Sequence, residues 1–158
     1  MQIELRERTC EHVKVYFEKT QSEEVRRFLP ISAKTLEDAL ADYEKSLLPC
    51  ATSFGRVILA DGQYVGDVWC YALDECDPDA MLSFCVFEST SWGKGIATEA
   101  VRLFLLEIRT RLQIKKVGAF VYADNVASQR VLSKNRFVLR ERFLEDGVLS
   151  CYFELEIN

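Results

Sequence analysis

The stretch Glu88–Ala100, ESTSWGKGIATEA, places two glycines and a lysine directly before the longest apolar-periodic segment of the chain. It follows the apolar run Met81–Phe87, which predicts a strand. Glycines allow such a loop to fold with successive main-chain N–H groups pointing inward. A helix start adds its own unpaired N–H donors and the positive end of its dipole. The stretch is therefore either a packing turn or a cradle for an anion such as a pyrophosphate.

Two known phosphate-binding patterns fit this loop poorly. A Walker loop requires Ser or Thr after its lysine, whereas Lys94 is followed by Gly95. A dinucleotide fingerprint requires three spaced glycines, and counting from Gly93 the last position is Thr98. What remains is a strand, a G-K-G-I-A loop and a helix that opens at Ala97.

Composition sets further limits. A chain of 158 residues predicts one domain, residues 1–158. Its net charge of −5 argues against nucleic acid as the main partner and leaves room for a cationic acceptor. Six cysteines without a C-x-x-C pair, together with one histidine, predict reduced thiols in a cytoplasmic protein with no metal site. The charged start MQIELRERTC does not resemble a signal peptide, and no apolar run reaches membrane-spanning length, so we expect no membrane partner.

Hydrophobic periodicity predicts an α+β fold. The expected helices are Cys10–Lys19, Ser22–Leu29 ended by Pro30, Thr35–Leu48, Ala97–Leu112 and Val126–Lys134. The expected strands are Gln2–Arg6, Val57–Ala60, Tyr64–Leu73, Met81–Phe87, Lys116–Tyr122, Val138–Phe143 and Cys151–Ile157. A strand–helix–strand segment implies one right-handed parallel crossover. We therefore predict a single mixed, mostly antiparallel sheet flanked by helices.

Two motifs resemble the GNAT acyltransferase superfamily. Trp92–Ala97 is similar to its acetyl-CoA signature, Q/R-x-x-G-x-G/A, and SWGKGIATEA is close to the form found in the ribosomal-protein N-terminal acetyltransferase branch. Trp92 replaces the Gln or Arg, as that branch often shows. NVASQRVLSKNRF resembles the N-x-x-S helix of the branch, which ends in a G-F pair; Phe137 is kept and Arg136 replaces the glycine. The resemblance covers nearly the whole chain and implies a GNAT-like fold.

The resemblance also implies a set of acetyl-CoA contacts. The main chain of Val86 and Phe87 would pair with the pantetheine arm. Asn125 and Ser128 match residues that contact the arm and its sulfur end, although Asn at a helix N-cap is also a common structural choice. The pyrophosphate would be held by Gly93, Lys94, Gly95, Ile96, Ala97 and Thr98.

The catalytic residues are less well defined. Acyl transfer from a thioester to an amine requires that the ammonium lose a proton, that the oxyanion be stabilised and that the leaving thiolate gain a proton. One branch of the family has a glutamate on the strand before the asparagine and a tyrosine in the following helix. The matching positions here are Phe120 and Leu132, so both groups are missing. The candidate general acid is then Ser128, with water or direct thiolate departure as alternatives.

Three carboxylates are candidates for the general base, and the sequence does not choose among them. Asp67 shares a strand face with Trp69 and Tyr71 if alternation is regular, which would suit an ammonium, although a solvated face is the plainer interpretation. Glu88 ends the strand that enters the glycine loop. Glu154 lies in the last strand and could point to either face.

The resemblance implies an acetyl-CoA-dependent N-acetyltransferase. The acetyl group would pass to a primary amine, either a protein N-terminus or a small amine, by direct attack in a ternary complex without a metal. The alternative is a domain with this fold that binds acyl-CoA without catalysis, as a sensor or interaction module. A homodimer is left open.

Overall fold

The computed structural model describes residues 1–29 and 33–157, which form one seven-stranded sheet. The strands are β1 (Ile3–Arg6), β2 (Phe54–Ala60), β3 (Gln63–Tyr71), β4 (Asp79–Val86), β5 (Lys116–Tyr122), β6 (Val138–Glu145) and β7 (Val148–Glu156). Their spatial order is β1-β2-β3-β4-β5-β7-β6, and every neighbouring pair is antiparallel except β4 and β5. The predicted mixed α+β sheet with one parallel crossover is confirmed.

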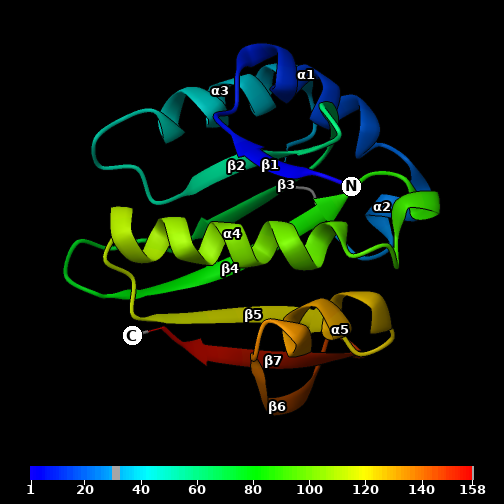
Figure 1. Cartoon of the computed structure of the whole chain (residues 1–158), viewed down its shortest axis with the longest axis vertical. Helices are drawn as coiled ribbons and strands as arrows, with labels where there is room; N and C mark the ends of the chain where they lie inside the picture. Colours follow the sequence, from blue (N-terminus) through cyan, green and yellow to red (C-terminus); the bar gives the residue numbers. More distant parts are fainter. Residues whose placement is uncertain (30–32, 158) are drawn as a thin grey trace.

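The helices lie on both faces of this sheet. They are α1 (Cys10–Lys19), α2 (Glu23–Arg26), α3 (Leu36–Ser46), α4 (Ile96–Arg111) and α5 (Val126–Lys134), with a short 3₁₀ turn η1 (Ser89–Ser91) that the sequence did not predict. Figure 1 shows α4 and α5 in front of the strands, with α4 lying along β4. None of the described helices is long and apolar enough to cross a membrane.

The predicted second helix is shorter than expected. The predicted helix was to begin at Ser22; Ser22 is instead the N-cap, its side chain accepts a hydrogen bond from the main-chain N–H of Val25, and the helix ends at Arg26. The chain then continues in a tighter turn, in which Phe28 donates to the Val25 carbonyl. The predicted stop at Pro30 lies outside the described residues.

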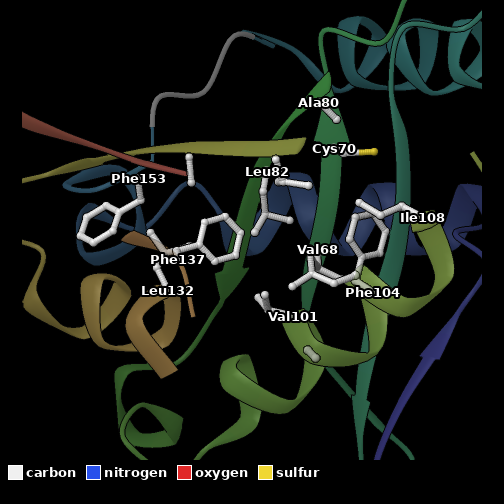
Figure 2. Close-up of a cluster of buried hydrophobic side chains, with 14 of the residues drawn as sticks. Val68, Cys70, Ala80, Leu82, Val101, Phe104, Ile108, Leu132, Phe137 and Phe153 are labelled. Carbon is white, nitrogen blue, oxygen red and sulfur yellow. The ribbon is translucent and has the colours of Figure 1, made fainter. Parts of the chain in front are cut away.

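The main core forms between α4 and the centre of the sheet. Val101, Phe104 and Ile108 form a fully buried stripe on α4, because a spacing of three or four residues brings side chains to one helix face. They pack in one buried cluster with Val68 of β3 and Leu82 of β4 (Figure 2).

A second, smaller cluster lies on the opposite face. Cys85 and Trp69 pack there with Tyr16 of α1 and Val25 of α2. Neighbouring residues on β3 and β4 face opposite sides of the sheet, because side chains alternate along a strand. Helices α1 and α2 therefore cover the face that α4 and α5 leave free.

The sheet opens between its two parallel strands. β4 and β5 pair only at Asp79↔Lys116, Ala80↔Val117 and Met81↔Gly118. Beyond these residues, β4 stays paired with β3 as far as Val86, and β5 stays paired with β7 as far as Tyr122. The two strands therefore diverge, and a gap in the sheet begins after Met81.

Candidate active site

The loop before α4 has the backbone of an anion cradle. Gly93 and Gly95 have φ of +74° and +84°, a left-handed conformation that side-chain-bearing residues rarely adopt. Gly95 is the N-cap of α4 and supplies no side-chain hydrogen bond. In the described part of the chain, none of the successive main-chain amides from Gly93 to Thr98 has an acceptor within the protein. These N–H groups are free to bind an anion.

The cradle lines a cleft of about 260 Å³ that occupies the gap between β4 and β5. One wall is the β4 segment 82–86, and the other is formed by residues 119–121 of β5 and by α5. Glu24 and Val25 of α2 line it as well, together with Phe28 in the turn that follows this helix. Three features with different chemistry therefore line one cleft. They are the free main-chain amides of the glycine loop, the unpaired edges of β4 and β5, and the Glu24 carboxylate.

The structure places the predicted site residues in two groups. Those that line the cleft are Val86, Gly93, Gly95, Ile96, Ala97, Thr98, Asn125 and Ser128. Those that lie outside its lining are Phe87, Lys94, Asp67 and Glu88.

The end of β4 already has partners for its main chain. The indole N–H of Trp92 donates to the Val86 carbonyl at 2.8 Å, and the Phe87 N–H donates to the Val65 carbonyl at 3.0 Å. Trp92 therefore ties the glycine loop to the strand that precedes it. The β4 residues that border the cleft and lack a β5 neighbour begin earlier, at Leu82.

Asn125 positions Ser128 at the start of α5. The Asn125 side-chain oxygen accepts a hydrogen bond from the Ser128 main-chain N–H at 3.2 Å, which is an N-cap interaction. Asn125 and Ser128 both line the cleft. The capping interaction thus fixes the first turn of α5 against the open edge of β5.

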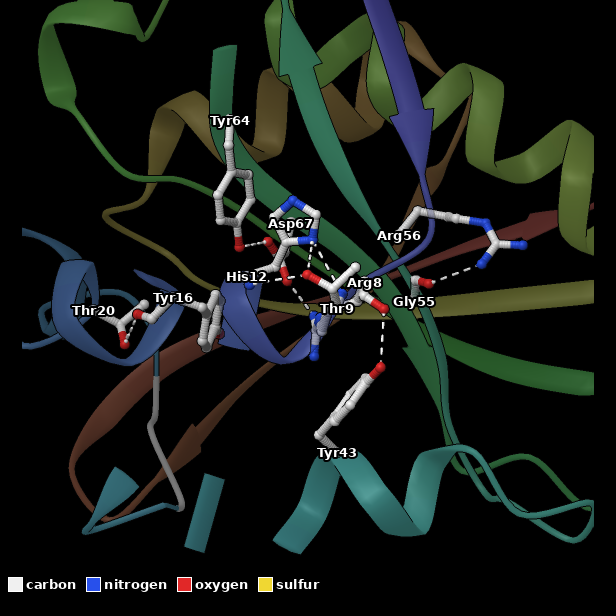
Figure 3. Close-up of polar contacts among 10 residues, drawn as sticks. All are labelled: Arg8, Thr9, His12, Tyr16, Thr20, Tyr43, Gly55, Arg56, Tyr64 and Asp67. Atoms are coloured by element: carbon white, nitrogen blue, oxygen red, sulfur yellow. Dashed lines mark hydrogen bonds and ion pairs between the residues drawn. The ribbon is translucent and has the colours of Figure 1, made fainter. Parts of the chain in front are cut away.

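Asp67 lies inside the protein rather than at a substrate surface. Its side chain is fully buried, the Arg8 guanidinium donates to one oxygen and the Tyr64 hydroxyl donates to the other (Figure 3). Burial raises the pKa of the Asp67 carboxyl, while the adjacent Arg8 opposes that rise. The carboxylate thus fixes the segment before α1 to β3.

Glu88 lies at the surface, beside the loop. Its side chain is 60% exposed and pairs with Lys19 of α1, with 3.2 Å between the ammonium nitrogen and the carboxylate oxygen. Such an exposed ion pair contributes little to stability. It bridges the C-terminal end of α1 and the end of β4.

Sequence reasoning missed three charged residues of the cleft. Glu24 is the only carboxylate among the described lining residues, and the sequence had placed it only within the predicted helix Ser22–Leu29. Arg130 and Lys134 also line the cleft from α5. Their spacing of four residues, which places them on one helix face, was the available sign.

The chain is similar to known proteins over most of its length. The profile of the acetyltransferase (GNAT) domain matches residues 2–138. The chain therefore belongs to the GNAT acetyltransferase family. No curated protein matches the sequence.

Several solved structures share the fold at low identity. A spermidine N-acetyltransferase from Vibrio cholerae, in complex with CoA and spermine, has a TM-score of 0.87 at 14% identity, covering 98% of this chain and 95% of that one. RimL, a ribosomal L7/L12 alpha-N-protein acetyltransferase in complex with coenzyme A, has a TM-score of 0.84 at 17% identity, covering 99% of this chain and 95% of that one. The aminoglycoside acetyltransferase AAC(6')-Ib in complex with coenzyme A has a TM-score of 0.81 at 15% identity, covering 98% of this chain and 95% of that one.

The glycine cradle can be tested with a matched pair of substitutions. Gly95 and Gly62, in the β2–β3 turn, have φ of +84° and +83°, and an added Cβ would meet no atom within 4 Å at either position. Gly95→Ala and Gly62→Ala should therefore each cost about 1 kcal/mol of stability. Only Gly95→Ala should weaken acetyl-CoA binding, by about tenfold or more, because its methyl group enters the anion site. Calorimetric titration and chemical denaturation measure both effects; equal affinities in the two variants would contradict the cradle.

The buried position of Asp67 predicts a structural phenotype. Asp67→Asn should lower the free energy of unfolding by about 2–3 kcal/mol, because Arg8 loses its anionic partner. Glu88→Gln should change it by less than about 1 kcal/mol, because the ion pair with Lys19 is exposed. Urea denaturation compares the two variants. A stable, folded Asp67→Asn protein that has lost its transferase activity would instead give Asp67 a direct role in proton transfer.

Proposed function

We propose that the protein transfers an acetyl group from acetyl-CoA to a primary amine by direct attack in a ternary complex. The observation that carries this proposal is the continuity of the cleft. It joins the unpaired amides from Gly93 to Thr98 to the open strand edges beyond Met81 and to Ser128. An elongated anionic thioester fits such a space with its phosphates at one end and its acyl group at the other.

Each part of the cleft would bind a different part of acetyl-CoA. The amides at the start of α4 would hold the pyrophosphate, and Arg130 and Lys134 would add positive charge from α5. The pantetheine arm would lie in the gap, along the edge of β4 that has lost its β5 partner. The thioester would then lie within the sheet, near Ser128 and Phe120.

The proposed reaction breaks one C–S bond and forms one C–N bond. The neutral amine attacks the thioester carbonyl carbon, and the carbonyl electron pair moves onto oxygen. Collapse of this oxyanion expels the thiolate, which takes a proton from the Ser128 hydroxyl as the proposed donor. The attacking nitrogen, which becomes positively charged on forming the C–N bond, loses its extra proton through water, and this proton restores the Ser128 hydroxyl. The proton lost by the ammonium passes to Glu24 or to water.

A cysteine-linked acyl intermediate is disfavoured by the site. Cys85 is the only thiol among the described residues that line the cleft. Burial raises the pKa of the Cys85 thiol to about 12, so it is protonated near neutral pH. A protonated thiol is a poor nucleophile, which supports direct attack by the amine.

One observation favours a non-catalytic acyl-CoA-binding domain as the second candidate. The two positions that hold a glutamate and a tyrosine in one branch of the family are Phe120 and Leu132. Leu132 is fully buried in the main core, where it offers no proton and no access to the cleft. A domain that retains the cradle without those groups could bind acyl-CoA as a sensor.

Transfer activity separates the two candidates. Acetyl-CoA and a mixture of primary amines should give acetylated products detectable by mass spectrometry. Ser128→Ala should reduce kcat by about tenfold to a hundredfold, more than it weakens acetyl-CoA binding, whereas Ser133→Ala, at an exposed position of α5, should not reduce kcat. Tight acetyl-CoA binding without acetylation of any amine would establish the sensor instead, and unchanged kcat in Ser128→Ala would remove Ser128 from the proton transfer.

A further inference from the structure

The face of β5, β7 and β6 opposite α4 and α5 carries an unusual set of side chains. Strand register places thirteen residues on this face. Four of them, Lys116, Glu145, Val148 and Glu156, lie at its ends and contribute two acids and one lysine. We call the other nine the aromatic–acidic shelf: Gly118, Phe120 and Tyr122 of β5, Ser150, Tyr152 and Glu154 of β7, and Val138, Glu141 and Phe143 of β6. Four of the nine are aromatic, two are acids and none is basic. Such a surface suits a cation that also carries apolar groups.

The aromatic rings form one connected group around Phe120. The ring centroid of Phe120 lies 5.1 Å from that of Tyr152 and 5.9 Å from that of Phe143. Phe120 is 54% exposed although β5 is an interior strand of the sheet. An exposed aromatic cluster on a paired strand is unusual for a solvated surface and indicates a binding surface.

Glu154 is held in place within this group. Its carboxylate accepts a hydrogen bond from the Tyr152 hydroxyl at 2.9 Å, and its side chain is only 19% exposed. The Tyr152 ring lies over Gly118, where an added Cβ would come within 2.7 Å of the ring. The missing side chain at position 118 thus makes room for the ring that orients Glu154.

Two basic residues lie near this carboxylate, and each has other contacts or a long separation from it. The hydrogen bond with Asp79 and, to a smaller extent, the charge of Glu154 raise the pKa of the Lys116 ammonium. Arg140 is exposed, and its Nε lies 3.9 Å from a Glu154 oxygen, longer than a hydrogen bond. Lys116 pairs with Asp79, with 3.2 Å between the ammonium nitrogen and the carboxylate oxygen. Glu141 lies opposite Tyr152 on the same face and adds a second negative charge to the shelf.

The shelf is continuous with the cleft. Phe120 belongs to both, since it lines the cleft and lies at the centre of the aromatic group. Glu154 lies on β7, the next strand after β5, and the cleft lies between β5 and β4. Adjacent strands are about 4.8 Å apart, so Glu154 is on the order of 10 Å from the centre of the cleft.

We propose that the acceptor is an aliphatic di- or polyamine: one amine reacts in the cleft while a second, ammonium-bearing end rests on the aromatic–acidic shelf against Glu154. The aromatic faces of Phe120 and Phe143 bind the chain and its cation, and the carboxylates supply the opposite charge. This inference rests on the proposed function and specifies the substrate class of the same site.

The test compares two amines that differ only in the second charge. 1,6-Diaminohexane and n-hexylamine share a six-carbon chain and a primary amine, and the diamine can span the distance of about 10 Å derived from the strand spacing. The wild-type kcat/KM should favour the diamine by about tenfold or more, beyond the statistical factor of about two for its two reactive ends. Glu154→Gln should remove most of this preference by lowering kcat/KM for the diamine.

Two further variants keep the test independent of folding. Phe143→Ala alters an edge strand and should also reduce the preference for the diamine, through the lost aromatic contact. Glu37→Gln removes an equal charge from α3, away from the shelf, and should leave the preference unchanged. Persistence of the preference in both Glu154→Gln and Phe143→Ala would overturn the inference.

A binding measurement separates failure of this inference from failure of the transferase proposal. With the protein saturated by CoA, calorimetry should detect binding of 1,6-diaminohexane that weakens about tenfold in Glu154→Gln. Such binding without any transfer would leave the shelf in place and overturn the enzymatic proposal. Transfer to both amines at equal efficiency would support the enzyme and overturn the shelf. The shelf proposal would also be overturned if the diamine did not bind, or if it bound equally to the wild type and to Glu154→Gln.

Discussion

The structure depends on the point at which β4 and β5 stop pairing. Their ladder ends at Met81↔Gly118, while each strand continues in register with its other neighbour. The sheet therefore stays continuous at one end and is split at the other, without losing the strands on either side. The cleft, the open strand edges and the access from both faces all follow from this one break.

Packing on one side and a loop contact on the other maintain the split. Val101 and Phe104 of α4 belong to the same buried cluster as Leu132 of α5, so both helices are anchored beside the gap. Trp92, which replaces the polar residue of the family signature, ties the glycine loop to β4 through the Val86 carbonyl. The glycine loop is thus held at the end of β4, where the proposed function places the phosphate groups of acetyl-CoA.

The sequence predicted helix boundaries and core-facing helix sides, because these depend on residues close together in the chain. The α5 boundaries Val126–Lys134 were predicted correctly, and the α4 stripe gave the core face, because capping and 3.6-residue periodicity are properties of short segments. The burial of Asp67 was not predictable, since its partner Arg8 is 59 residues away. Glu24 and the shelf escaped detection for the same reason: strand order and helix placement bring them to the cleft.

Site-resolved hydrogen exchange would test most directly whether acetyl-CoA occupies the split sheet. At saturating acetyl-CoA, the account predicts slower exchange at the main-chain amides of residues 93–98, which have no acceptor among the described residues. Exchange in the distant turns at Gly62 and Gly147 should stay unchanged. Unaltered exchange at residues 93–98, or protection confined to another surface, would contradict the assignment of this loop as the anion cradle and of the cleft as the acetyl-CoA site.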